Sequence, residues 1–97
     1  MTFTLVVKHS VTAEAARIYA YREQERPGQG DRFISALVEC YARIMANPYG
    51  CQIRKGDYSH VMLTTLKYRV VFRVKEARIY VVHVRHTSRR PSKKFGP

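Results

Sequence analysis

The sequence predicts an α+β domain with the element order β-α-α-β-β-β, in which a small, curved, mainly antiparallel sheet carries an N-terminal helical hairpin packed on one face. Residues 13–46 have a helical pattern that is broken only around residues 27–30. Residues 60–86 are rich in β-branched and aromatic residues and are divided by very short polar links. A chain of 97 residues has room for one hydrophobic core, so both parts must share it in a single domain, residues 1–97.

The first element is a strand. Residues 3–9, FTLVVKH, form a short apolar and β-branched run of the kind that favours extended backbone. Ser10 and Thr12 then stand as candidate N-caps of a helix that we expect from residue 13 to about residue 24. Pro27 and the glycine after it end this helix, because proline cannot continue the helical hydrogen bonds.

A second helix is predicted over residues 31–46, with Asp31 at its start and Asn47-Pro48 at its end. Its apolar stripe recurs at helical spacing and consists of Phe33, Leu37, Tyr41, Ile44 and Met45. The link between the two helices is too short to join distant elements. The helices should therefore form an antiparallel hairpin that lays one apolar face on the rest of the chain.

Three strands are predicted in the second half, at residues 60–66, 68–74 and 77–86. Connections this short join neighbouring antiparallel strands, so the three should form a meander. Residues 53–60, IRKGDYSH, are interpreted as a turn-like link that presents its basic residues at a loop tip. The polar and basic residues 87–97 are interpreted as a tail.

Positive charge is concentrated in the second half of the chain. The net charge is +11, yet residues 1–50 carry six basic and five acidic side chains, whereas residues 51–97 carry twelve basic and two acidic ones. A surface that only keeps a protein soluble would mix the two signs. The asymmetry indicates a polyanionic partner, either nucleic acid or an acidic protein.

Composition also argues against a membrane protein, a secreted protein and a zinc protein. No apolar run approaches the length of a membrane span, and the N-terminus lacks the basic lead and cleavage site of a signal peptide, so we expect a cytoplasmic protein without a membrane partner. Cys40 and Cys51 are interpreted as reduced thiols, because two isolated cysteines lack the further ligands of a zinc site. No metal or other cofactor is expected.

Five stretches in order resemble the RelE/ParE superfamily of bacterial type II toxins: the opening strand, YREQERPGQGDRFISAL, IMANPYG, LKYRVVFRV and VVHVRHTSRRP. The resemblance covers roughly residues 3–91 and is closer to the ParE and plasmid-stabilisation branch. It implies a growth-inhibiting toxin that forms a hetero-oligomer with a cognate acidic antitoxin. ParE-type members poison DNA gyrase, whereas RelE-type members cut messenger RNA on the ribosome.

For this chain we expect a ParE-like inhibitor that acts by binding gyrase rather than by its own bond chemistry. The alternative is a ribosome-dependent endoribonuclease of the RelE type. That branch implies a catalytic tyrosine or histidine near the C-terminus, where this sequence reads RHTSRRPSKK and contains no tyrosine. A nucleic-acid-binding domain without toxicity is a third reading.

The candidate site residues lie in the basic half. Arg69 and Arg73 share one face of a predicted strand, and His83 and Arg85 share a face of the next, with His86 at its end. If the arginines point away from the helices, these residues form a cationic patch. Metal-free RNA cleavage would use Arg69, Arg73, His83 and His86 as acid, base and phosphate-stabilising groups. In the alternative reading the histidines are half-buried, hydrogen-bonded structural residues, and the two arginines form a solvated strand face or an anchor for the antitoxin's carboxylates.

A larger set is predicted to contact the antitoxin or the target through positive charge. It consists of Arg54, Lys55, Arg69, Arg73, Arg85, Arg89, Arg90, Lys93 and Lys94. Each could pair with phosphates, with strong salt dependence, or with the carboxylates of a segment that folds on binding. Composition does not separate these two partners.

Overall fold

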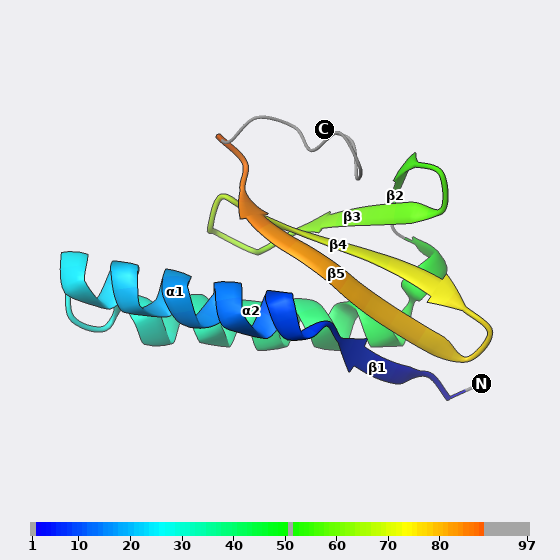
Figure 1. The fold of residues 1–97 in the computed structure, drawn as a ribbon, viewed down its shortest axis with the longest axis horizontal. Helices are drawn as coiled ribbons and strands as arrows, with labels where there is room; N and C mark the ends of the chain where they lie inside the picture. The colour runs from blue at the N-terminus through cyan, green and yellow to red at the C-terminus, as the bar shows by residue number, and fades with distance from the viewer. Residues whose placement is uncertain (1, 51, 89–97) are drawn as a thin grey trace.

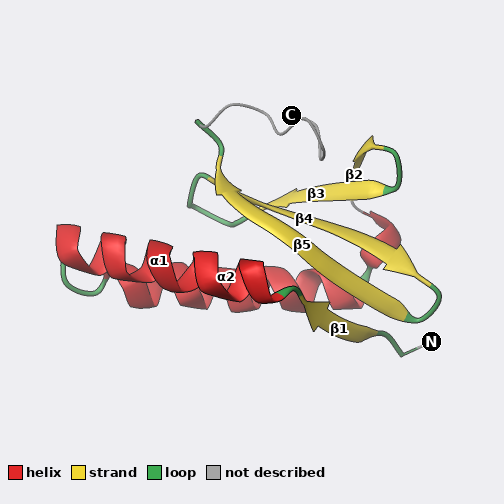
Figure 2. Ribbon diagram, viewed as in Figure 1, coloured by secondary structure: helices red, strands yellow, loops and turns green. Residues whose placement is uncertain are grey.

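The computed structural model describes residues 2–50 and 52–88, and its elements follow the predicted order with one addition (Figure 1). The elements are β1 (Thr4–Val7), α1 (His9–Glu25), α2 (Gln29–Ala46), a short 3-10 helix η1 (Pro48–Gly50), β2 (Gln52–Lys55), β3 (Tyr58–Met62), β4 (Tyr68–Lys75) and β5 (Arg78–His86). The two helices form an antiparallel hairpin on one face of the sheet (Figure 2). The predicted α+β class is confirmed.

The sheet has five strands in the order β1-β5-β4-β3-β2. All neighbours are antiparallel except β1, which runs parallel to β5. The interpretation of residues 53–60 as a turn-like link is wrong, because β2 and the start of β3 pair there as a hairpin. Lys55 lies opposite Tyr58, so only Gly56 and Asp57 form the turn, and Gly56 supplies the left-handed backbone (φ 60°) that such a tight turn needs.

Helix α1 begins earlier than predicted, at His9, so Ser10 and Thr12 lie inside its first turn and are not its caps. The N-cap is Lys8, which makes no side-chain capping bond. Its backbone N–H instead donates to the carbonyl of Val81 in β5, over 3.0 Å. The start of this helix is therefore determined by the pairing of the first strand with the last, rather than by a local capping pattern.

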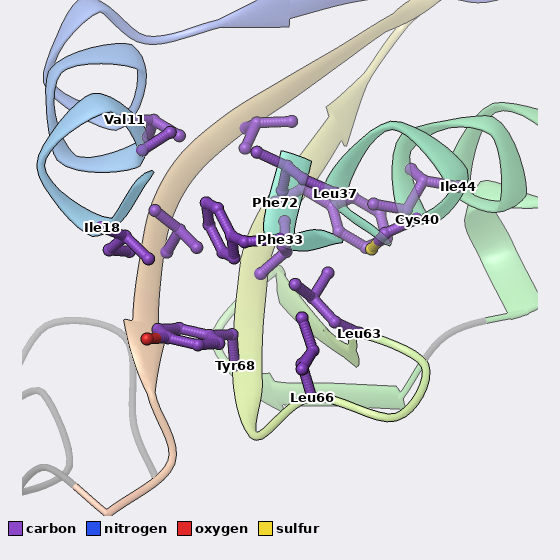
Figure 3. Packing of buried hydrophobic residues seen from close by; sticks show 14 of the residues in the cluster. Val11, Ile18, Phe33, Leu37, Cys40, Ile44, Leu63, Leu66, Tyr68 and Phe72 are labelled. Carbon is purple, nitrogen blue, oxygen red and sulfur yellow. The ribbon is translucent and has the colours of Figure 1, made fainter. Parts of the chain in front are cut away.

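The core lies between the hairpin and the sheet (Figure 3). Helix α1 buries Val11, Ala15 and Ile18, which recur at helical spacing. The buried residues of α2 recur at helical spacing as well. The other core residues are Phe33, Leu37, Cys40, Ile44, Leu63, Leu66, Tyr68, Val70, Phe72, Ile79, Val81 and Val84. Full burial of one large apolar side chain stabilises the fold by about 1.5–3 kcal/mol. Cys40 is a buried cysteine of the core, and Cys51 lies outside the described residues.

The turn between the helices is held by side chains of α1. Gly28, the N-cap of α2, has a left-handed backbone (φ 91°) and no side chain to cap the helix. The carboxylate of Glu23 takes over that role, since it accepts the N–H groups of Gly28 and Gly30 at 3.0–3.1 Å. Arg22 donates to the Gln29 side chain over 3.0 Å. Side chains of α1 therefore supply the hydrogen bonds that hold the RPGQG turn between the two helices.

Candidate functional site

A bulge in β5 decides which side chains face away from the helices. Val71 lies opposite His83, whereas the next residue of β4 lies opposite Val81, so Val82 is left without a partner in the ladder. The strand therefore buries Val81 and Val84 against the hairpin instead of alternating regularly. Without this extra residue, the second half of β5 would turn its other side chains to the core.

We call the sheet surface opposite the helices the outer face. Residues directly opposite each other in a ladder share a face, so the register defines its members. Across β3, β4 and β5 they include His60, Met62, Arg69, Val71, Arg73, Lys75, Arg78, Tyr80, His83 and Arg85. The predicted cationic patch required Arg69 and Arg73 to point away from the helices. They do so, and they share this face with His83 and Arg85.

The outer face places cationic groups in adjacent rows. Arg69 lies directly opposite Arg85, whose residue is only 4% exposed and whose Nη1 donates to the backbone carbonyl of His86. The next row places His60 and His83 on either side of Val71. Since neighbouring strands are about 4.8 Å apart, the backbones that carry the two imidazoles are about 10 Å from each other.

Arg73 lies at one end of this face, beside the turn of the β2–β3 hairpin. Its Nη2 is 3.3 Å from the Asp57 carboxylate, and its guanidinium carbon is 6.0 Å from the centre of the Tyr58 ring. Tyr80 lies opposite Arg73 on β5 and is half-buried. The Asp57 carboxylate thus pairs with an arginine of the outer face.

Not every predicted site residue joins this face. His86 belongs to the other face, where its ring packs edge-on against Tyr68 at 5.1 Å, so the structure separates it from Arg69, Arg73 and His83. Arg54 and Lys55 lie within β2 and not at a loop tip, since the tip is the turn that contains Asp57. The remaining predicted contacts, Arg89, Arg90, Lys93 and Lys94, lie outside the described residues.

His86 instead helps to line a cavity of about 750 Å³ between α1 and the end of β5. Its lining consists of Glu14, Arg17, Ile18, Tyr21, Arg22, Glu25, Gln29, Tyr68, His86 and Ser88, and we call it the hairpin groove. The guanidinium of Arg22 lies 5.8 Å from the Tyr68 ring centre, and the Ser88 N–H donates to Nδ1 of His86. That bond leaves Nε2 as the protonated nitrogen of the neutral imidazole.

An apolar surface is exposed on α2. Ile34, Val38 and Met45 recur at helical spacing, and their residues are 36%, 60% and 39% exposed. Tyr21, at the hairpin groove, is 57% exposed, and its hydrogen bond to Glu25 raises the pKa of the phenol. The hairpin therefore offers apolar contacts on both of its helices.

The part of the chain that the structure describes has no group of three or more potential metal ligands, and none of its helices has the length and apolar character of a membrane span.

The model of the ParE toxin of the type II toxin–antitoxin system parDE matches residues 5–91 of this sequence. The chain belongs to the ParE toxin family. The match includes the hairpin, the whole sheet and the two surfaces described above, and it confirms the ParE-branch resemblance seen in the sequence.

Two solved structures have the same fold as this ParE-family toxin. A chain of the chromosomal ParDE TA system from P. aeruginosa superposes with a TM-score of 0.78 at 15% identity, covering 90% of this chain and 98% of the other. A mutant of the E. coli toxin RelE in the free state gives 0.64 at 15% identity, covering 91% and 86%. No curated protein sequence matches.

Sequence reasoning missed His60 of the toxin's outer face and Asp57 beside that face. Both lie in the segment 53–60 that was interpreted as a link and that forms the β2–β3 hairpin. The Gly56-Asp57 pair is itself a hairpin-turn signal of the two-residue kind, with glycine available for a positive φ.

Proposed function

We propose that this ParE-family toxin acts in the cytoplasm by binding DNA gyrase through its outer face, and that a cognate acidic antitoxin neutralises it. The observation that carries the proposal is the convergence of Arg69, Arg73, His83 and Arg85 on one face opposite the helical hairpin. A target that already holds DNA presents phosphates and acidic protein groups, and both are attracted by such a face.

The antitoxin would occupy two surfaces. A partner helix would lay apolar side chains against the hairpin groove and the exposed stripe of α2, as amphipathic helices do in apolar grooves. An acidic extended segment would cross the outer face and pair with its arginines. Such an antitoxin would both cover the target-binding groups and neutralise part of the +11 charge of the toxin.

A supercoiling assay with purified gyrase tests the target. We expect the wild-type toxin to inhibit supercoiling and Arg69→Gln to inhibit it at least about tenfold less, since a lost charge-assisted contact costs about 1.5–3 kcal/mol. Arg32→Gln is the matched control, because it removes the same charge from an exposed position of α2. Equal loss in both variants, or no inhibition by the wild type at high excess, contradicts the gyrase proposal.

A specific observation favours a second candidate, the ribosome-dependent endoribonuclease. His60 and His83 stand on either side of Val71, in the row next to Arg69 and Arg85. One imidazole could take the 2′-hydroxyl proton, the other could protonate the leaving oxygen, and the arginines could stabilise the phosphorane.

A translation-coupled cleavage assay separates this candidate from the first. If the toxin is an endoribonuclease, messenger RNA is cut only in the presence of translating ribosomes, and His83→Gln lowers the cleavage rate by about 100-fold or more. Intact transcripts beside inhibited supercoiling support the gyrase inhibitor. Unchanged colony counts after induced expression would argue against toxicity by either route.

A further inference from the structure

We propose that Asp57 is a built-in competitor for the outer face: its carboxylate occupies Arg73 in the free toxin and must be displaced when a polyanion binds. This role rests on the proposed function, in that the outer face is taken as the polyanion-binding surface. Asp57 would then restrain weak, nonspecific binding and leave the face to a partner that supplies several anionic groups at once.

The position of Asp57 is fixed by the hairpin that carries it. The turn between β2 and β3 contains only Gly56 and Asp57, and Gly56 provides the left-handed backbone that closes it. A turn this short leaves Asp57 little freedom to swing away from the sheet. In β4, Arg73 lies beyond Phe72, the residue opposite Ser59 in β3, so the turn and the arginine lie at the same end of the sheet.

The ion pair between Arg73 and Asp57 is weak enough for a ligand to displace Asp57. Its Nη2–Oδ2 distance is 3.3 Å, longer than a good charge-assisted hydrogen bond, and the side chains of Arg73 and Asp57 are 36% and 58% exposed. Solvent-exposed pairs of this type contribute little stability. Displacing Asp57 therefore costs the fold little, while the arginine remains held beside the Tyr58 ring.

The guanidinium of Arg73 also has a hydrogen-bond donor that Asp57 does not use. Nε of Arg73 is buried and has no hydrogen-bond partner among the described residues, although Nη2 contacts the carboxylate. Nε and Nη2 lie on the same edge of a guanidinium, the edge that binds phosphate with two parallel hydrogen bonds. A phosphate that replaced Asp57 could satisfy both nitrogens, which the contact with Asp57 does not do.

The test is fluorescence anisotropy of a short labelled oligothymidylate at several salt concentrations. We expect Asp57→Asn to tighten binding by about three- to tenfold and to steepen the salt dependence by about one ion, since one further phosphate contact forms. Glu76→Gln is the matched control, because it removes the other acidic side chain of residues 51–97, which lies in the β4–β5 turn. It should change affinity by less than about twofold at moderate salt.

A double variant shows whether the effect passes through Arg73. In an Arg73→Gln background, Asp57→Asn should change binding no more than Glu76→Gln does. Equal gains from Asp57→Asn and Glu76→Gln in the wild-type background would show a general charge effect and overturn the proposal, as would weaker binding by Asp57→Asn. Thermal melts establish folding, and Asp57→Ser replaces Asp57→Asn if that variant does not fold.

The same proteins, assayed for gyrase inhibition, separate this proposal from the proposed target. Tighter oligonucleotide binding by Asp57→Asn without any effect on supercoiling would reject gyrase and support the competitor role of Asp57. Inhibition by the wild type with no difference in oligonucleotide binding between Asp57→Asn and Glu76→Gln would support the target and reject the competitor.

Discussion

The carboxylate of Glu23, near the end of α1, accepts a 3.0 Å hydrogen bond from the backbone N–H of Gly30 in the first turn of α2. One helix therefore caps the next, because the N-cap of α2 is a glycine without a side chain. The hairpin presents the groove and the apolar stripe of α2 that the proposed antitoxin would contact, so this bond would affect antitoxin binding through the geometry of the groove.

Glu23→Gln should lower the free energy of unfolding by about 1–2 kcal/mol, because the three N–H contacts to the carboxylate lose their charge assistance. Urea denaturation followed by circular dichroism measures the change. Glu14→Gln is the control, since the exposed Glu14–Arg17 pair is worth less than about 0.5 kcal/mol. Equal loss in the two variants would mean that Glu23 does not cap α2.

Gly30→Ala should destabilise the toxin by about 1–3 kcal/mol through crowding. A Cβ at this position would lie 2.8 Å from two ring carbons of Tyr19 and 2.8 Å from its backbone carbonyl oxygen, which cannot move without shifting α1. Gly28→Ala is the comparison, since its Cβ would meet nothing within 4 Å and only the positive φ would be strained. Thermal unfolding should rank Gly30→Ala as the less stable of the two.

Thr65 has a left-handed backbone with φ 67°, which a β-branched residue adopts at a cost. Thr65→Asn should raise the free energy of unfolding by about 0.5–1 kcal/mol, because asparagine tolerates this conformation. Thr65→Val keeps the branched side chain and should give no gain. A rise for valine as large as that for asparagine would show that the backbone conformation is not the cause.

Burial raises the pKa of Tyr41 to about 12, above its usual value of 10.0. The folded protein thus keeps this proton at a pH where the unfolded chain releases it, so the contribution of Tyr41 to stability is complete below pH 10 and is lost as the pH rises toward 12. The fall in melting temperature between these values should be shallower for Tyr41→Phe. Identical profiles would refute the assignment to Tyr41.

The sequence predicted the helical hairpin and the order of elements along the chain because those signals are local. A helical period that breaks at residues 27–30, and β-rich segments joined by short links, leave few alternative arrangements. The face of Arg69 and Arg73 followed from simple alternation along β4, where Val70 and Phe72 turn to the core.

The features that escaped prediction depend on contacts distant in the chain. Strand β2 is an edge strand without an alternating apolar pattern, so its pairing partner determines it. The bulge at Val82 lies in a run of residues that all favour strands. Composition therefore does not reveal where the alternation between the two faces of β5 shifts by one residue. The start of α1 depends on Lys8 bonding to Val81. His86 was grouped with His83 and Arg85 because it follows them in the sequence, although alternation along β5 places its side chain on the opposite face.

Strand β1 pairs with β5, with Thr4 opposite Arg78. The beginning of the chain therefore waits for nearly the last part of it to leave the ribosome before the sheet can close, and such distant pairings form slowly. Because β5 also supplies His83 and Arg85, a nascent or truncated toxin has no complete outer face. If toxicity acts through the outer face, as proposed, synthesis itself would delay it and would give a neutralising protein made at the same time an interval in which to bind.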